Sequence, residues 1–176
     1  MIRELGRPGD LGWVVQAHGE AYAAEFGWDT TFEALVARIV ADYANDHDPA
    51  RESAWIAEVD GERVGCVFCV DARADQTAVL RILLVDPAAR GLGLGGRLVD
   101  TCVGFARAAG YRRMRLWTTD PLVAARQVYL RHGFRLTAEE PQRSFGADLV
   151  GQTYELDLAA RLPPDADLPG RTSASR

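Results

Sequence analysis

The centre of the chain carries a glycine-rich segment of a kind that can hold phosphate groups. It reads Arg-Gly-Leu-Gly-Leu-Gly-Gly from Arg90 to Gly96, and an amphipathic helix pattern follows it. Glycines at a helix start leave the first backbone N–H groups uncovered, with the positive end of the helix dipole behind them. Arg90 adds a fixed positive charge. The segment therefore predicts a site for the phosphates of a bound ligand.

The same glycines also satisfy the dinucleotide-binding pattern G-x-G-x-x-G, at Gly91, Gly93 and Gly96. In that pattern the first glycine follows its strand almost directly, within a parallel sheet. Here residues 86–90 intervene, and a predicted antiparallel meander comes first. A P-loop is excluded because no Lys-Ser or Lys-Thr pair follows the glycines. A turn without a ligand would not need four glycines, since each costs conformational entropy. The pattern therefore favours a phosphate-bearing ligand other than a dinucleotide.

The elements around the glycines form a strand, a loop and a helix. The strand covers Thr77 to Val85, and Pro87 lies just beyond it, where a residue without an N–H group ends the pairing. The helix begins within the glycines and ends near Gly110, which suits a helix C-cap. The glycine N–H groups should therefore lie at the carboxyl end of a strand.

Apolar periodicity and turn signals predict the remaining elements. The Asp-Gly pair at 60–61 is a strong hairpin signal. The candidate helix N-caps are Asp10, Thr30 or Thr31, and Asp120. The predicted strands cover residues 2–5, 54–59, 63–71, 77–85, 112–118, 134–139 and 152–158, and the predicted helices run to about residues 26, 43, 109 and 132. The order β-α-α-β-β-β-α-β-α-β-β indicates an α+β, or mixed α/β, domain over residues 1–160. A loop is expected over 141–149 and a mobile tail over 161–176.

Composition excludes several classes of protein. The chain has 176 residues and a formal net charge of −5, which argues against nucleic-acid binding. It has no apolar run near the roughly 20 residues of a membrane span, and its first residues lack the core of a signal peptide. The three cysteines, an odd number, indicate reduced thiols and a cytoplasmic location. Cys66 and Cys69 should point to opposite faces of a strand, so no metal site is expected. The oligomeric state is left open, with a homodimer as one alternative.

Two motifs give the chain a resemblance to the GNAT superfamily of N-acetyltransferases. Arg90, Gly93 and Gly95 fall on the fixed positions of its acyl-CoA-binding motif, Arg/Gln-x-x-Gly-x-Gly/Ala. The stretch Ala125 to Phe134 is similar to its A-x-x-x-Y-x-x-x-G-F motif. The chain resembles in particular the acetyltransferase half of proteins that carry a MarR-type DNA-binding domain, here standing alone. The resemblance covers residues 1–158 and implies a splayed mixed sheet of about six to seven strands with helices on both faces.

The resemblance also implies acetyl-CoA as the acyl donor and indicates where it would bind. The pantetheine arm would lie as an extra strand between the strand ending at Leu83–Val85 and the parallel strand at 115–118. The pyrophosphate would lie on the glycine N–H groups. The implied cofactor-binding residues are Leu83, Leu84, Val85, Arg90, Gly91, Leu92, Gly93, Leu94, Gly95, Gly96 and Ala125.

Tyr129 is the catalytic residue that the second motif implies. After an amine attacks the thioester, the leaving thiolate needs a proton, which a phenol can give. Without the motif, Tyr129 would be interpreted as a core aromatic of an amphipathic helix. The chain is therefore predicted to be an acyl-CoA-dependent N-acyltransferase that moves acetyl to a primary amine by direct attack. The alternative is an acyl-CoA-binding sensor or interaction module without turnover.

The general base does not follow from the motifs. Many family members carry Glu or His on the strand before the glycine segment, and residues 77–85 contain neither. Candidates elsewhere are Glu25, Asp29, Glu58 and Asp120. A water relay, or an amine that arrives neutral, are further alternatives.

The acceptor amine is expected to contact Glu25, Phe26, Trp28 and Asp29. The loop between the first two helices flanks the acceptor in this fold, and aromatic rings beside carboxylates suit a cation. The competing interpretation is that the rings pack between helices and the acids are solvated. Arg81 could instead hold a carboxylate of the acceptor, or pair with an acid of the chain. A small amine, an amino acid, an antibiotic and a protein amine all remain open as acceptors.

Overall fold

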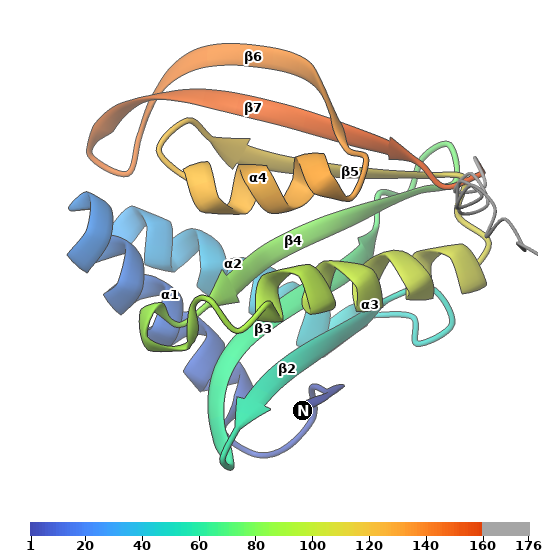
Figure 1. The fold of residues 1–176 in the computed structure, drawn as a ribbon, viewed down its shortest axis with the longest axis horizontal. Coiled ribbons are helices and arrows are strands. Elements are labelled where there is room, and N and C mark those ends of the chain that lie inside the picture. Colours follow the sequence, from blue (N-terminus) through green and yellow to red (C-terminus); the bar gives the residue numbers. More distant parts are fainter. Residues whose placement is uncertain (160–176) are drawn as a thin grey trace, which may run out of the picture.

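The computed structural model describes residues 1–159 as one seven-stranded sheet with helices on both faces (Figure 1). Its elements are β1 (Ile2–Glu4), α1 (Asp10–Phe26), α2 (Thr30–Asp46), β2 (Ser53–Val59), β3 (Glu62–Asp71), β4 (Thr77–Val85), the 3-10 turn η1 (Pro87–Ala89), α3 (Leu94–Ala108), β5 (Arg113–Thr119), α4 (Val123–Arg131), β6 (Arg135–Ser144) and β7 (Ala147–Asp157). The predicted tail, 161–176, lies outside the described residues.

The strands lie in the order β1-β2-β3-β4-β5-β7-β6. β1 to β4 form an antiparallel meander, β4 and β5 are parallel, and β5, β7 and β6 are again antiparallel. The predicted mixed sheet is therefore confirmed. So is the predicted parallel pairing of the two strands that precede and follow the glycine-capped helix in the sequence.

The parallel pair at the middle of the sheet separates after a short distance. β4 and β5 pair only from Thr77 with Arg113 to Leu80 with Leu116. Beyond that point a β-bulge bends β4, because residues 82–83 together oppose the single residue Val67 of β3. The first of them, Ile82, has a φ of 44°, an uncommon value for a β-branched residue. The two strands then diverge toward α1 (Figure 1).

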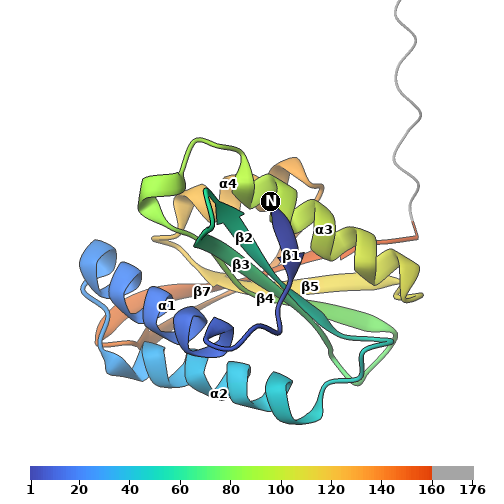
Figure 2. The same ribbon diagram turned by 90° about the horizontal axis from the view of Figure 1, so that it is seen from below.

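The sheet separates two apolar cores, one beneath each pair of helices. α1 and α2 cover one face, and α3 and α4 cover the other (Figure 2). Alternation along β3 supplies both cores, since Cys66 packs with the α1–α2 side and Cys69 with the α3 side. The prediction that these two cysteines point to opposite faces is confirmed.

The helix caps differ from those predicted. Gly9, not Asp10, is the N-cap of α1. Asp10 is instead fully buried and forms salt bridges with Arg3 at 2.8 Å and Arg63 at 2.9 Å. It also accepts hydrogen bonds from two backbone N–H groups, and together these partners compensate the cost of burying its charge. These contacts connect β1, α1 and β3.

The other two predicted caps are also wrong. Asp29, not Thr30 or Thr31, caps α2, and its carboxylate accepts from the Thr31 N–H at 3.0 Å. α4 begins at Val123 without a side-chain cap, and the Asp120 carboxylate accepts from the Val150 N–H of β7 at 2.7 Å. In both places a carboxylate satisfies a backbone donor that the sequence pattern did not reveal.

The predicted loop over 141–149 is a hairpin. Pro141 lies within β6, where it is tolerated because β6 is an edge strand. The turn is formed by Phe145 and Gly146, with φ values of 56° and 79°. Such a pair suits the tight turns of hairpins, although Asn-Gly is the usual sequence. The Phe145 ring packs on Trp28 and Phe32, which holds the turn against the helices.

Candidate active site

The divergence of β4 and β5 is flanked by two cavities. The first, of about 730 Å³, is formed by the end of β4, the glycine segment, α4 and part of α1; we call it the glycine-loop cleft. The second, of about 500 Å³, lies among α1, α2, β4, β5 and α4; we call it the α1–α2 cavity. Both cavities are lined by Tyr22, Leu83, Leu122 and Ala125, which therefore form a junction between them.

The glycine segment leaves its helix start open. Gly91 and Gly93 adopt left-handed φ values of 85° and 70°, and Gly93 is the N-cap of α3 without a side-chain cap. The first backbone bond of the helix runs from Arg97 N–H to Gly93 O at 3.2 Å. The N–H groups of residues 94–96 therefore have no helical partner, as expected for a phosphate-binding helix start.

Arg90 and Glu25 form an ion pair across the mouth of the glycine-loop cleft. One guanidinium nitrogen of Arg90 lies 2.9 Å from Glu25 Oε2, and a second donates to Oε1. The hydrogen bonds to Glu25 and its charge raise the pKa of Arg90. Glu25, which was predicted to contact the acceptor, thus lies in the cleft that holds the predicted cofactor residues.

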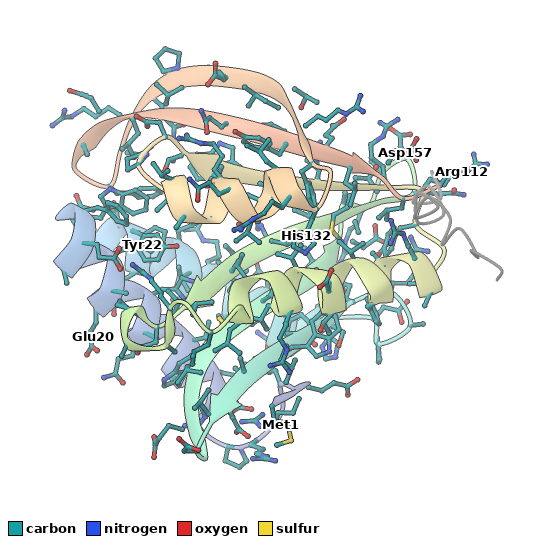
Figure 3. All side chains as sticks on the ribbon, viewed as in Figure 1. Met1, Glu20, Tyr22, Arg112, His132 and Asp157 are labelled. Carbon is teal, nitrogen blue, oxygen red and sulfur yellow. The ribbon has the colours of Figure 1, made fainter. Side chains whose placement is uncertain are left out.

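Nearly all the predicted cofactor residues come together in this cleft. Ten of them line it: Leu83, Leu84, Val85, Arg90, Gly91, Gly93, Leu94, Gly95, Gly96 and Ala125. Leu92 does not, and its side chain is exposed. His132, the C-cap of α4, also lines the cleft. Its Nε2 lies 3.1 Å from Asp100 of α3, so it connects the two helices (Figure 3).

Tyr129 lies one helical turn after Ala125 of the junction and lines the α1–α2 cavity. Its side chain is buried and packs against Phe134 and Tyr154. Burial raises the pKa of its hydroxyl far above the ordinary value, with a smaller contribution from Tyr22. The phenol is therefore protonated at neutral pH and lies next to the junction.

Of the other three predicted acceptor residues, Phe26 and Trp28 pack in an aromatic cluster, and Asp29 caps a helix. Phe26 lines the glycine-loop cleft, and Trp28 lines the α1–α2 cavity. Both belong to an aromatic cluster with Tyr22, whose ring centroid lies 5.7 and 5.2 Å from theirs. Asp29 caps α2, and its N–H donates to Phe145 O at 3.1 Å, so the β6–β7 turn covers this loop.

None of the four candidate carboxylate bases is among the residues that line the α1–α2 cavity. Glu25 pairs with Arg90, Asp29 caps α2, and Asp120 accepts from β7. Glu58 pairs with Arg3 at 2.7 Å, near the β1 edge of the sheet. A carboxylate from this set therefore does not contact the cavity directly.

Three buried side-chain atoms within residues 1–159 lack a hydrogen-bond partner, and all three belong to residues that line the α1–α2 cavity. They are Nε2 of His18, Oγ1 of Thr118 and Oγ1 of Thr119. Nδ1 of His18 lies 2.7 Å from the Val14 carbonyl and donates to it. Burial lowers the pKa of His18 to about 4. Buried polar atoms without partners are rare, and here they mark a cavity suited to a polar ligand.

Sequence reasoning missed these three residues for identifiable reasons. His18 lies on an apolar helix face, where it reads as an isolated core residue. Thr118 and Thr119 end β5 in a region without a motif. Only the tertiary structure shows that these residues of α1 and β5 line a common cavity.

A mixed sheet that opens beside a glycine-rich helix start is the architecture that the sequence motifs imply for an acyltransferase. The Acetyltransferase (GNAT) family model matches residues 15–134, which is more than half of the chain. The chain belongs to the acetyltransferase (GNAT) family.

Proteins similar to this chain differ in their size. An uncharacterized N-acetyltransferase of Schizosaccharomyces pombe is 30% identical over 119 residues, which cover 67% of this chain and 72% of that protein. The N-acetylaspartate synthetase of Danio rerio is 33% identical over 91 residues, covering 52% of this chain and 32% of that protein. The chain thus matches about a third of the length of the latter.

Solved structures share the fold at low sequence identity. A putative acetyltransferase from Salmonella typhimurium, solved with acetyl-CoA, has a TM-score of 0.72 at 22% identity, covering 95% of this chain and 98% of that one. A ribosomal-protein-alanine N-acetyltransferase from Brucella melitensis has a TM-score of 0.71 at 18% identity, covering 89% and 99%. These likenesses support the fold.

Two further observations concern the described residues as a whole. None of the helices in residues 1–159 has the length and apolar character needed to cross a membrane. Over the same range, no three His, Cys, Asp or Glu side chains are grouped so that they could hold a metal ion.

Proposed function

We propose that the chain is an acetyl-CoA-dependent N-acetyltransferase acting on a small-molecule or peptide amine. The observation that carries the proposal is the meeting of the two cavities beside Tyr129. One cavity has an open helix start for phosphates, and the other has three unpartnered polar atoms for an acceptor. Family membership supports the same chemistry.

The residues of the glycine-loop cleft fit a coenzyme A moiety. The N–H groups at the start of α3 would hold the pyrophosphate. The β4 backbone beyond Leu80 has no β5 partner and would pair with the amide-rich pantetheine arm. Gly95 also leaves room for close approach, since a Cβ there would point toward Val85 and Val128 at 3.7 and 3.6 Å, both of which line the cleft.

When bound, acetyl-CoA supplies an activated thioester. Backbone N–H groups of β4 near Val85 would donate hydrogen bonds to the carbonyl oxygen of the thioester. Attack of the amine nitrogen on the carbonyl carbon would break the bond from that carbon to sulfur. The Tyr129 hydroxyl would give its proton to the leaving thiolate and regain a proton from water. Leu83, Leu122 and Ala125 give the junction an apolar lining.

The acceptor must also lose a proton. Because burial lowers the pKa of His18 to about 4, its imidazole is neutral at pH 7 and is only a weak base. The amine proton leaves through water, or the amine arrives already neutral.

The experiment is a thiol-release assay with acetyl-CoA and a panel of primary amines, on wild-type protein and Tyr129→Phe. We expect turnover in the wild type and a drop in kcat of about tenfold or more in the variant, because general acid catalysis is lost. The Kd for acetyl-CoA, measured by calorimetry, should change little. Equal kcat in both proteins would refute the role of Tyr129.

An acyl-CoA-binding sensor is the second candidate, favoured by the lack of a free carboxylate base among the described residues of the α1–α2 cavity. Tight coenzyme A binding without turnover on any amine would select it.

The cytoplasmic location and the homodimer alternative stay predictions. The free, buried state of all three cysteines is consistent with the cytoplasmic location.

A further inference from the structure

Two arginines lie on the sheet wall of the α1–α2 cavity. In the β4–β5 register Val79 pairs with Arg115, and Arg81 is two residues further along β4. Because side chains alternate along a strand, Arg81 and Arg115 point to the same face. Arg81 also lies opposite Phe68, which belongs to the core on the α1–α2 side. Both arginines line the cavity.

Neither guanidinium has an acidic partner in the described part of the chain. No carboxylate oxygen of residues 1–159 lies within 4.0 Å of Arg81 or Arg115, and neither side chain forms a hydrogen bond there. Glu155, the cross-strand neighbour of Arg115, stays beyond this distance. Both arginines are exposed residues that line the cavity, whereas the largely buried Arg3 is paired with Asp10.

The cavity offers little negative charge to balance them. Among its described lining residues the single acid is Asp71, which Arg51 already holds at 3.0 Å. Arg81 is exposed as a whole, but partial desolvation lowers its pKa, and the charge of Asp42 on α2 opposes this. Most of the remaining wall is apolar, including Trp28 and Phe32. Two cations with ten unused N–H donors therefore line a largely apolar cavity.

We propose, resting on the function proposed above, that the acceptor is an amino carboxylate of amino-acid size whose carboxylate is bound by Arg81 and Arg115. Guanidinium groups bind carboxylates through paired N–H donors. Arg81 is two residues from Leu83 of the junction, so an acceptor held there can direct its amine toward the thioester. Polyamines and lysine side chains of basic peptides are disfavoured, because they would add positive charge beside two unpaired cations.

The charges also bear on the missing base. A nearby guanidinium favours the neutral form of an amine, because like charges disfavour ionisation. Two guanidinium groups and one bound carboxylate leave one net positive charge in the cavity. This charge lowers the pKa of the acceptor amine. A larger fraction of the acceptor is then the neutral amine, which can attack the thioester without a carboxylate base in the cavity.

The test compares L-leucine with 3-methylbutylamine and L-leucinamide in the thiol-release assay. The first analogue is leucine without its carboxylate, and the amide keeps the size of leucine without the negative charge. The amide has the less basic amine, so a preference for leucine over leucinamide cannot come from a larger neutral fraction. We expect kcat/KM to be higher for leucine by about 30-fold or more, as for loss of a charge-assisted pair.

Variants locate the effect. Arg81→Gln and Arg115→Gln should each remove most of the preference while leaving the KM for acetyl-CoA unchanged. Arg113→Gln is the matched control, since Arg113 lies on the same strand and face as Arg115 but outside the cavity. It should alter kcat/KM by less than about threefold. Acetylation of all three amines with equal kcat/KM would overturn the inference and leave the proposed function standing.

A binding measurement decides the case without turnover. Calorimetry with L-leucine and the protein saturated with coenzyme A should show binding that Arg81→Gln abolishes. If no amine is acetylated, the proposed function fails, yet binding that depends on Arg81 would still support the carboxylate site. Absence of leucine binding to the loaded wild-type protein, together with absence of its acetylation, would overturn the inference.

Discussion

The Glu25 carboxylate forms an ion pair with the guanidinium of Arg90, the group that is predicted to bind the cofactor phosphates. Both partners are partly exposed, with 46% of the Arg90 and 28% of the Glu25 side chain accessible. An ion pair of this kind is worth about 0.2–1 kcal/mol. Arg90 can therefore exchange Glu25 for a phosphate at small cost, and Glu25 then stays as a like charge beside the ligand.

We predict that Glu25→Gln lowers the KM for acetyl-CoA by about threefold, because the free energy of breaking an exposed pair is no longer needed. The Kd for coenzyme A, measured by calorimetry at low and at high salt, should fall in parallel, and the gain should shrink as salt screens the charges. Glu20→Gln is the control on the same helix, since Glu20 is exposed and bonds only Gln16 in the described residues. Weaker cofactor binding in Glu25→Gln would mean that Glu25 positions Arg90 instead.

Single residues show how far sequence reasoning reaches at this site. The motif positions Arg90, Gly95 and Ala125 were predicted to share one site, and they line one cleft. Glu25 was predicted to contact the acceptor, but its ion-pair partner Arg90 lies 65 residues away in sequence. No local pattern encodes such a pair. His18 was overlooked because its significance depends on the absence of a partner for Nε2, which only the packed structure reveals.

At the scale of elements, α3 combines two kinds of glycine. Gly95 faces the glycine-loop cleft, whereas Gly104 of the same helix has open space where a Cβ would lie, with no neighbouring heavy atom within 4 Å. Neither has a left-handed φ, so alanine is compatible with the backbone at both positions.

We predict that Gly95→Ala and Gly104→Ala both stabilise the fold by up to about 1 kcal/mol, through higher helix propensity. Only Gly95→Ala should weaken coenzyme A binding, by about tenfold, because its methyl group occupies the approach to the open N–H groups. Chemical denaturation and calorimetry on both variants measure the two effects separately. Equal Kd values in Gly95→Ala and wild type would show that the phosphates bind elsewhere.

The order of elements was predictable because apolar periodicity and hairpin signals mark most of them. The β6–β7 hairpin was not, for two physical reasons. Pro141 reads as a strand breaker unless the strand is known to be at an edge. Phe145 holds a positive φ in the turn because it packs on Trp28 and Phe32, which is tertiary information. The splay of β4 likewise depends on a bulge at Ile82 that no sequence signal marks.

At the scale of the molecule, His18 lies between the α1–α2 layer and the sheet. Burial there depresses its pKa from 6.5 to about 4. The unfolded chain therefore binds more protons than the folded protein between these values, and the free energy of unfolding falls as pH decreases from 6.5 to 4. The full effect is about 3 kcal/mol, at 1.36 kcal/mol per pKa unit.

We predict that the free energy of unfolding in urea decreases between pH 7 and pH 4.5, and that His18→Leu shows a smaller decrease. Subtracting the two profiles removes the titration of all other groups. The lowered pKa of Asp10 contributes mainly below the range measured, because its stabilisation is lost only as pH falls below the ordinary aspartate value. Parallel profiles for the two proteins would rule out His18 as the source.

The register of the central strands has a mechanical meaning. β1–β4 and β5–β7 are joined within the sheet only from Thr77–Arg113 to Leu80–Leu116, near one end of both strands. The sheet therefore consists of two halves that are hydrogen-bonded to each other only at that end. A ligand that pairs with the free strand edges beyond Leu80 would connect the two halves at the other end. Donor binding would then add a second connection between the two halves of the sheet, which already share the core beneath α3 and α4.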